Sequence, residues 1–464
     1  MKNTFVLLFA LLTTITCYAQ YDADVENYNY VLGTQTIGPS YKFTTDDKLV
    51  ETAKAIQAMR SNNLKISLST SSYGLSGNYS TLASLVKDNL SFKQVIDMPF
   101  KNYFFWARSH ANWGDGYSET ERNDDSTQIY ALTKYLLTQY NNTGKTFFLG
   151  HWEGDWYLLP NYDKTYIPSD ERCQAMAKWL RTRQNAVDKA KSETAFSNVM
   201  VYSYVEVNQV VDAKFSGKKR VVNCVLPLTN VDYVSYSSYD AQWYDQAKYN
   251  SVLDYIEANL PAKLGIPGKR VFIGEIGNSL EKSGWDIYKH ESDNRAFFKT
   301  AISWGSPFVL YWEMYNNEIN ATNNQQRGFW LINDKNEKQP LYYTFTRFYD
   351  AAKQYVARYK LINKTLPNYL EYAGWAANYL SSKPTSIDVP LQNNTGVKIW
   401  GHERKILLEN DNIAAQISVF STNSVLISMS TLLPNEKRTI TLPVGSYIVR
   451  IQKNNQINTH KIIL

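Results

Sequence analysis

Cysteine and histidine are scarce in this chain. Only three of its 464 residues are cysteine and five are histidine, which excludes a disulfide-dense scaffold and a cysteine-rich zinc module. The histidines stand far apart, at positions 110, 151, 290, 402 and 460, so they lack the spacing of a zinc site. Asp115 and Asp155 could offer oxygens to calcium, yet no loop repeats the acidic pattern that calcium needs. We therefore expect neither a metal nor another cofactor.

Runs of one charge are also missing. Lys and Arg number 49 and Asp and Glu 43, a net charge of +6 that is spread over the whole chain. A protein that binds nucleic acid or an anionic membrane would gather its basic residues, so neither partner is expected. Beyond the N-terminal segment, no stretch reaches the roughly 18 apolar residues of a membrane span. With 44% hydrophobic residues the chain can bury a large core, which excludes a disordered protein.

The N-terminus has the features of a signal peptide. Lys2 supplies a positive charge, residues 5–12 form an apolar stretch, and Cys17 and Ala19 stand at the small-residue positions of a cleavage site. We predict cleavage after Ala19, with Gln20 as the first mature residue, and therefore a secreted or cell-surface protein. The alternative is a lipoprotein signal in which Cys17 is lipidated.

Two cysteines, Cys173 and Cys224, remain in the mature chain. They could pair, but a sequence does not reveal the geometry that a disulfide requires. Two separate buried thiols are the alternative.

Composition changes near residue 380. Of the 66 aromatic residues, 63 precede this point and the last 84 residues hold three. Residues 381–386 have the composition of a linker. Beyond it, runs such as 417–420, 424–427 and 446–451 alternate between apolar and polar residues, which predicts the strands of a small β-sandwich. The apolar end of the chain, 461–464, predicts a terminal strand paired in a sheet.

This C-terminal region resembles the sorting domain of type IX secretion cargo. The resemblance covers about the last 70 residues and rests on Leu-Pro-Val-Gly-Ser-Tyr-Ile-Val-Arg-Ile at 442–451 and on the Lys-Ile-Ile-Leu ending. It implies that the secretion machinery is a partner of this domain. The alternative is an accessory β-sandwich that packs on the first domain or contacts glycan.

Residues 25–360 alternate between strand and helix patterns. Apolar runs predict strands at 30–38, 64–68, 103–106, 146–149, 199–205, 231–236, 270–273 and 308–312. Helical spacing of apolar residues is found at 46–61, 127–140, 170–191, 249–260, 294–304 and 341–359. About eight such units in some 340 residues predict an α/β fold of the (β/α)8 TIM barrel type. A doubly wound open sheet is the alternative, but no glycine-rich phosphate motif follows the first strand.

Two glutamates come just after predicted strands of this barrel. Glu153 follows the fourth strand and Glu275 the seventh, and each has a glycine nearby, Gly150 or Gly274, that would let a ligand approach the backbone. Catalytic residues of TIM barrels lie at the C-terminal ends of the strands, so both carboxyl groups should face one cleft.

Paired carboxyl groups across a cleft are what glycoside hydrolysis requires, one as an acid and one as a nucleophile or base. Repulsion between the two carboxylates and apolar neighbours such as Trp152 and Trp156 would raise the pKa of Glu153. A raised pKa suits Glu153 to the acid role. Aromatic side chains suit the apolar faces of sugar rings, which gives the high aromatic content a use.

At these positions the chain resembles the clan A retaining glycoside hydrolases. The resemblance assigns Glu153 as the acid/base and Glu275 as the nucleophile. Trp312, at the end of the eighth strand, matches the aromatic platform under the sugar at the cleavage site. Tyr236 or Tyr239, at the end of the sixth strand, matches the residue that hydrogen-bonds the nucleophile.

The chain departs from this pattern before the acid/base. Most members carry asparagine there, in contact with the 2-hydroxyl of the sugar, whereas this chain has Trp152. His151 or His110 could make that contact instead, or the substrate differs at this hydroxyl, or the site has decayed. Trp152 and Trp156 complete the expected set of substrate-binding residues.

Several other residues have open interpretations. Glu206 and Glu313 follow the fifth and eighth strands and would replace the chosen pair if the strand count were off by one. Trp113, Trp243 and Trp330 either line sugar subsites or belong to the core.

The expected protein is a secreted glycoside hydrolase that cleaves a β-linked poly- or oligosaccharide by retaining double displacement. Its predicted parts are a signal peptide (1–19), a catalytic barrel (20–380) and a C-terminal β-sandwich (381–464). The alternatives are a non-catalytic surface glycan-binding protein on the same scaffold and a non-glycosidic barrel enzyme.

Overall fold

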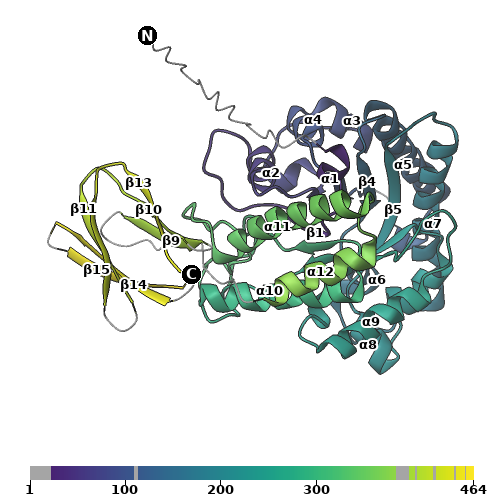
Figure 1. Ribbon diagram of the computed structural model, residues 1–464. Helices are drawn as coiled ribbons and strands as arrows, with labels where there is room; N and C mark the ends of the chain where they lie inside the picture. The colour runs from purple at the N-terminus through teal and green to yellow at the C-terminus, as the bar shows by residue number, and fades with distance from the viewer. Residues whose placement is uncertain are drawn as a thin grey trace, which may run out of the picture.

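The computed structural model describes residues 22–108, 113–382, 397–402, 405–421, 425–443, 446–454 and 456–463. The predicted signal peptide, His110 and most of the predicted linker therefore lie outside the described residues. Two folded parts are present, a barrel surrounded by helices and a smaller group of antiparallel strands beside it (Figure 1).

Eight parallel strands close into the predicted barrel in the order of the sequence, with β1 paired to both β2 and β8. The α/β TIM barrel expected from the strand and helix pattern is thereby confirmed. Its strands are β1 Leu32–Thr36, β2 Asn63–Ser67, β3 Asn102–Trp106, β4 Thr146–Gly150, β5 Met200–Val207, β6 Tyr233–Ser237, β7 Val271–Ile276 and β8 Val309–Tyr311.

Helices cover the outside of the barrel (Figure 1). Those of seven residues or more are α2 Lys48–Ala58, α3 Leu82–Asp88, α4 Leu90–Asp97, α5 Glu119–Gln139, α7 Asp170–Ser192, α8 Val210–Ser216, α9 Gln246–Asn259, α10 Ile287–Trp304, α11 Pro340–Asn363 and α12 Tyr369–Ser381. The shorter α1 and α6 span Ala23–Glu26 and Gly154–Leu158. Helix α2 shows how the sequence dictates an element: Asp47 caps its first turn, and Val50, Ala53 and Ile56 recur on its buried face.

Aromatic rings fill the inside of the barrel. Phe104 and Phe148 stack with ring centroids 4.6 Å apart and pack against Phe272 and Phe308. Tyr204 lies against the same group. Much of the high aromatic content is therefore core packing, whereas the sequence interpretation had connected it with sugar binding.

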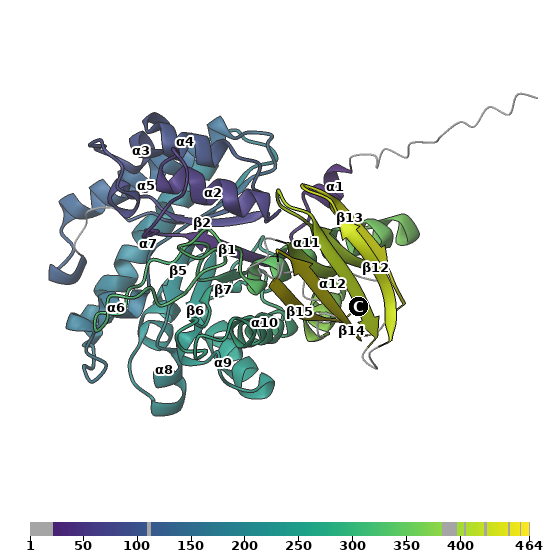
Figure 2. The ribbon, with the colours of Figure 1, turned by 90° about the vertical axis from the view of Figure 1, so that its left-hand side faces the viewer.

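The C-terminal strands form two facing sheets, as the sequence predicted. One has the order β13-β10-β9 and the other β12-β11-β14-β15. The strands are β9 Lys398–His402, β10 Lys405–Glu409, β11 Ala415–Ser421, β12 Leu426–Leu432, β13 Lys437–Thr441, β14 Ser446–Lys453 and β15 Gln456–Ile463. Alternate residues such as Ile417 and Val419 of β11 and Val449 and Ile451 of β14 form a buried core. The terminal strand β15 pairs with β14, and both ribbon views place this domain beside α10, α11 and α12 (Figures 1 and 2).

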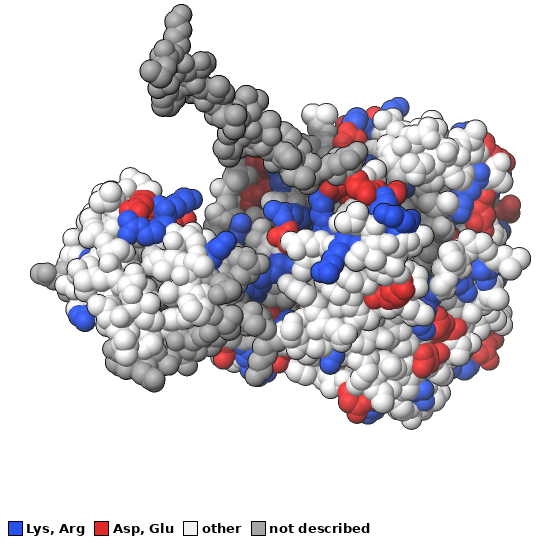
Figure 3. Space-filling model, in the orientation of Figure 1, with Lys and Arg blue, Asp and Glu red and all other residues white. Residues whose placement is uncertain are grey.

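The charge distribution agrees with the dispersed pattern in the sequence. On the face shown in Figure 3, basic and acidic side chains are interspersed. Among the described residues no helix combines the length and apolarity of a membrane span.

Candidate active site

Glu275 lies inside β7 and points into the barrel because the strand is irregular there. Tyr236 of β6 is aligned with Ile273, but the next residue, Ser237, is aligned with Glu275, so Gly274 is an extra residue. Such an insertion shifts the alternation of side chains between the two faces of a strand. Glu275 consequently reaches the interior, where only 3% of its surface is exposed.

Both oxygens of Glu275 accept hydrogen bonds. Lys65 Nζ lies 3.1 Å from Oε1, and Tyr239 Oη donates to Oε2 over 3.3 Å. Burial raises the pKa of Glu275 to about 7, while the charge of Lys65 and the two hydrogen bonds hold it down. The carboxyl group is thus buried but equipped with donors that favour its ionised form.

Lys65 is the functional residue that sequence reasoning missed. It lies in β2 with no exposed surface, and its ammonium contacts Glu206 Oε2 at 3.0 Å as well as Glu275. Burial on its own lowers the pKa of Lys65, but the two carboxylates outweigh it and raise the pKa. The sequence offered little signal, because Lys65 alternates with Leu64 and Ile66 as an exposed lysine would, whereas all five residues of β2 are buried. A buried lysine needs a partner of opposite charge.

Glu206 connects the two candidate catalytic glutamates. Its Oε1 accepts the backbone N–H of Glu153 at 3.0 Å, and its Oε2 accepts Ser235 Oγ at 2.7 Å in addition to Lys65. The side chain is completely buried. Glu206 therefore positions the loop of Glu153 relative to Lys65 and Glu275.

Glu153 stands three residues after β4, at the start of α6, with 8% of its surface exposed. Trp156 Nε1 donates to its Oε2 over 2.6 Å. Burial raises the pKa of Glu153 well above the ordinary 4.5, and the negative charges of Glu275 and Glu206 add to this effect. The environment thus favours the protonated form of Glu153, whereas Lys65 and Tyr239 favour the ionised form of Glu275, and an acid and a nucleophile need opposite protonation states.

This raised pKa has a consequence for stability. The native state keeps the proton of Glu153 above pH 4.5, where the unfolded chain releases it, so stability falls as pH rises from 4.5 toward the raised pKa. Glu153→Gln cannot ionise and should escape this fall. We expect its melting temperature to exceed that of the wild type increasingly above pH 4.5, measured by calorimetry from pH 4 to 8. A difference that is independent of pH would contradict the assigned pKa.

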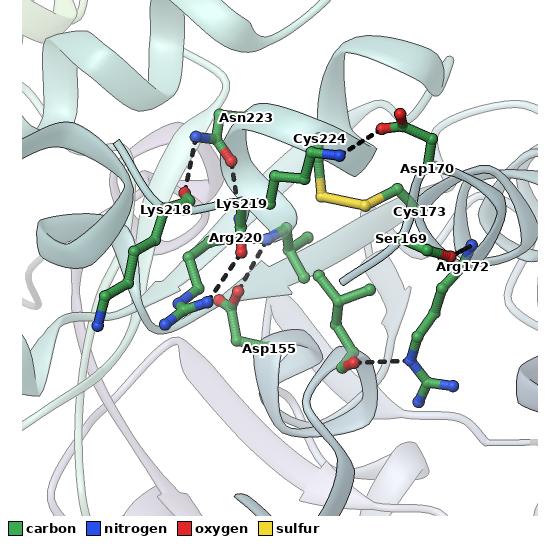
Figure 4. The surroundings of a disulfide bond; sticks show 12 residues. Asp155, Ser169, Asp170, Arg172, Cys173, Lys218, Lys219, Arg220, Asn223 and Cys224 are labelled. Carbon is green, nitrogen blue, oxygen red and sulfur yellow. Dashed lines mark hydrogen bonds and ion pairs between the residues drawn. A yellow bond between two sulfur atoms is a disulfide. The ribbon is translucent and has the colours of Figure 1, made fainter. Parts of the chain in front are cut away.

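Asp155 anchors the loop that carries Glu153. Its two carboxylate oxygens accept backbone N–H groups of Asn208, Gln209 and Val221 at 2.8 to 3.0 Å. These bonds attach α6 to the segments after β5 (Figure 4). The calcium role that the sequence left open for Asp155 is therefore not available, because backbone donors occupy its oxygens. Among the described residues no group of three or more potential ligands could hold a metal ion.

A disulfide reinforces the same region. Cys173 at the start of α7 is bonded to Cys224, with Cα atoms 5.8 Å apart (Figure 4). The neighbouring Arg172 donates to the carbonyl groups of Leu158 and Tyr157. Of the two sequence alternatives, the structure shows the disulfide. Hydrogen bonds thus tie the segment that follows Glu153 to α7, and the disulfide ties α7 to the segment of Cys224.

Removing this disulfide should destabilise the fold. The bond closes a loop across a separation of 51 residues, for which the chain-entropy estimate is about 4 kcal/mol and typical measured losses are about 2–4 kcal/mol. We expect Cys173→Ser/Cys224→Ser to lose that amount of unfolding free energy in urea titrations. Reductant should weaken the wild type similarly and leave the double variant unaffected. Equal stability of the two proteins would mean that the thiols do not pair in solution.

The space beside Gly150 and Gly274, the two glycines near the candidate glutamates, is filled by neighbouring side chains of the protein and is not open to a ligand. A Cβ atom on Gly150 would lie 2.2 Å from the ring of Tyr204, and one on Gly274 would lie 1.8 Å from Ser235 Oγ. The sequence interpretation of these glycines as ligand clearance is wrong. They admit the side chains that pack beneath the site and hold Glu206.

Aromatic side chains flank the glutamates. Trp312, after β8, belongs to a cluster with Ile37, Phe329, Trp106 and Tyr239, and its Nε1 donates to Glu318 over 3.2 Å. Its ring lies 6.1 Å from that of Trp106, which in turn lies 4.7 Å from Lys65 Nζ. Trp312 is therefore placed beside Tyr239, the donor to Glu275.

A second aromatic group surrounds Glu153. Trp152 contacts Tyr157 and Tyr162, with ring centroids 6.0 and 6.3 Å away, and Trp156 contacts Tyr162 at 5.8 Å. Trp152 and Trp156 are both partly exposed. They are available to a ligand that lies beside Glu153.

Two predicted substrate-binding residues do not reach the site. His151 has no exposed surface, packs against Trp179 and Tyr157, and keeps its neutral form because burial lowers its pKa to about 3. Tyr236 is also fully buried and donates to Asp240. Between the two tyrosines left open by the sequence, it is Tyr239 that contacts Glu275.

Most of the remaining candidates are buried. Glu313 is fully buried and accepts the backbone N–H of Ile37 at 2.9 Å. Trp113 and Trp330 are buried, at 5% exposure each, whereas 56% of Trp243 is exposed. His110, the other candidate for the sugar contact, is outside the described residues.

A cavity of about 560 Å³ opens beside the glutamates. It is formed at the C-terminal ends of β2, β3 and β4, and Trp106 and Trp152 belong to its wall. The described residues of its wall are Ser67, Leu68, Ser69, Thr70, Ser72, Gly77, Asn78, Tyr79, Ser80, Thr81, Leu82, Leu85, Trp106, Arg108, Gln128, Trp152 and Tyr157.

No protein-family model matches this chain, and no curated protein matches it. Among solved structures it is similar to an FMN-binding β-glucuronidase from Facaelibacterium prausnitzii (12% identity, 93% of this chain and 56% of that one, TM-score 0.42). A Bacteroides uniformis β-glucuronidase (9%, 94% and 46%, TM-score 0.46) and a family 39 glycoside hydrolase from Bacteroides cellulosilyticus (11%, 95% and 82%, TM-score 0.44) are also similar. The chain spans about half the length of the two glucuronidases.

Proposed function

We propose that this protein is a glycoside hydrolase that cleaves a β-linked poly- or oligosaccharide by double displacement. The observation that carries the proposal is the pair Glu153 and Glu275 at the ends of β4 and β7, which Glu206 and Lys65 connect. The pKa of Glu153 is raised well above its ordinary value, whereas Lys65 and Tyr239 hold down the pKa of Glu275. A carboxylic acid and a carboxylate in one site are the two groups that glycoside hydrolysis needs.

In the first step Glu275 acts as the nucleophile. One of its oxygens bonds to the anomeric carbon while the glycosidic C–O bond breaks, and Glu153 transfers its proton to the departing oxygen. Lys65 and Tyr239 keep the carboxylate ionised and oriented before the attack. The products of this step are a glycosyl-enzyme and the released alcohol.

In the second step Glu153, now ionised, removes a proton from water. The water oxygen bonds to the anomeric carbon and the Glu275–carbon bond breaks, which restores both groups. Two inversions leave the anomeric configuration unchanged.

Product stereochemistry tests the proposal. NMR spectra recorded in the first minutes of hydrolysis of an aryl β-glycoside and of β-glucans, mannans and xylans should show a β-configured reducing end. An α-configured first product would contradict double displacement. Affinity for a glycan without release of reducing ends would identify the alternative, a non-catalytic glycan-binding protein.

We also propose that the chain is exported and that its C-terminal domain serves the secretion machinery. The signal-like N-terminal segment, the sequence of the last 70 residues and the Cys173–Cys224 disulfide support this proposal, since disulfides persist in oxidising compartments. N-terminal sequencing of the protein recovered from the cell surface or medium should begin at Gln20.

A further inference from the structure

We propose that the cavity beside the glutamates binds a sugar residue that carries an anionic substituent, a carboxylate or a sulfate ester, with Arg108 as the recognising group. The inference rests on the proposed function and names the substrate class of the same site: an acidic β-linked glycan.

The position of the cavity makes it an extension of the catalytic site. Trp106 in its wall lies next to Trp312 and over Lys65. Trp152, also in the wall, directly precedes Glu153. A glycan with its scissile bond between Glu153 and Glu275 would therefore place another of its sugars within reach of this cavity. Its volume, about 560 Å³, is in the range of small-ligand sites.

The wall has the chemistry of a sugar site. Hydroxyl and amide groups dominate it, from residues such as Ser69, Thr70, Asn78 and Gln128, and rings are supplied by tryptophan and tyrosine. Neutral groups of this kind exchange hydrogen bonds with sugar hydroxyls, and flat rings pack on sugar faces.

Charge distinguishes the cavity from a site for neutral sugars. Among the described residues that line it, Arg108 is the one charged residue and none carries a carboxylate. Its guanidinium donates to Tyr157 Oη over 3.3 Å and lies 4.6 Å from the ring centroid of Tyr157. No ion pair joins Arg108 to any described carboxylate, whereas Arg183, Arg220, Arg295 and Arg327 each have one.

Arg108 contacts the ring of Tyr157, and the described residues of the cavity wall include no acidic group, so the guanidinium retains most of its donors for a ligand. The planar guanidinium matches the oxygens of a carboxylate or sulfate in a two-point contact. Charge-assisted hydrogen bonds of this type contribute enough to change kcat/KM about 10- to 100-fold.

The test compares matched β-linked oligosaccharides that are neutral, carboxylated or sulfated. The wild type should prefer one of the anionic substrates, and the preferred one identifies the substituent. Arg108→Gln should lower the ratio of anionic to neutral kcat/KM about 10- to 100-fold. Arg60→Gln is the matched control, because it removes an equal charge at the opposite end of β2 and should leave the ratio unchanged.

Two results would overturn the inference while the proposed function stands. One is cleavage of neutral and anionic substrates with equal kcat/KM by the wild type, and the other is an equal loss on all substrates in Arg108→Gln. If no substrate is cleaved at all, the proposed function fails separately. Calorimetric binding of the anionic oligosaccharides that depends on Arg108 would then still support the cavity as an acidic-sugar site, and absence of such binding would refute it.

Discussion

Glu275→Gln is expected to reduce kcat about 10⁴-fold or more while substrate binding changes little. Glutamine keeps the size of the side chain, and its one carbonyl oxygen can accept the hydrogen bond of Lys65 or that of Tyr239, but it cannot form the glycosyl-enzyme. Losses of this size are typical when a nucleophile is removed from a cooperating group. Initial rates on an aryl β-glycoside, together with calorimetric affinity for the uncleaved oligosaccharide, measure the two effects separately.

Chemical rescue assigns the two glutamates their roles. In Glu275→Ala, azide should occupy the vacated face and yield an α-glycosyl azide, whereas in Glu153→Ala it should attack the glycosyl-enzyme and yield the β-product. Glu257→Gln on the outer helix α9, where Glu257 pairs with Lys269, is the matched control and should retain full activity. Full activity in Glu275→Gln would refute the assignment of the nucleophile.

Lys65→Met should lower kcat/KM at pH 7 about 10²- to 10³-fold, the second-largest effect expected. Lys65 lowers the pKa of Glu275 by its charge and by a hydrogen bond. Without the ammonium, Glu206 and Glu275 face each other uncompensated, and the pKa of Glu275 rises above about 7. Because Glu275 must be ionised to attack, the acidic limb of the pH–rate profile should move to higher pH.

The pH profile separates this positioning role from a merely structural one. Removing one partner of a buried ion pair also costs about 3–5 kcal/mol of stability, so lost activity alone would be ambiguous. Lys65→Arg retains the charge and should keep the acidic limb near that of the wild type. Folded Lys65→Met protein with reduced activity but an unshifted limb would contradict the proposed role.

The site shows which features of function were accessible from local sequence. Glu153 and Glu275 were predicted because each stands near the C-terminal end of an apolar run, Glu153 three residues after β4 and Glu275 within the last two residues of β7. The C-terminal ends of the strands in a closed parallel barrel share one face. Lys65 was missed because its partners are 141 and 210 residues away in the chain. The choice between Tyr236 and Tyr239 depended on a register shift in β6–β7, which no pattern of hydrophobicity encodes.

The sequence by itself determined the order and type of the elements, the division into barrel and sandwich, and the two strand ends that carry glutamates. These depend on the period of apolar residues and on chain neighbours, which are local properties. Only the tertiary structure decided that Cys173 meets Cys224, that His151 is buried, that the glycines admit Tyr204 and Ser235, and that Lys65 joins Glu206 to Glu275. Each of those depends on residues far apart in the chain, whose proximity arises only when the barrel closes.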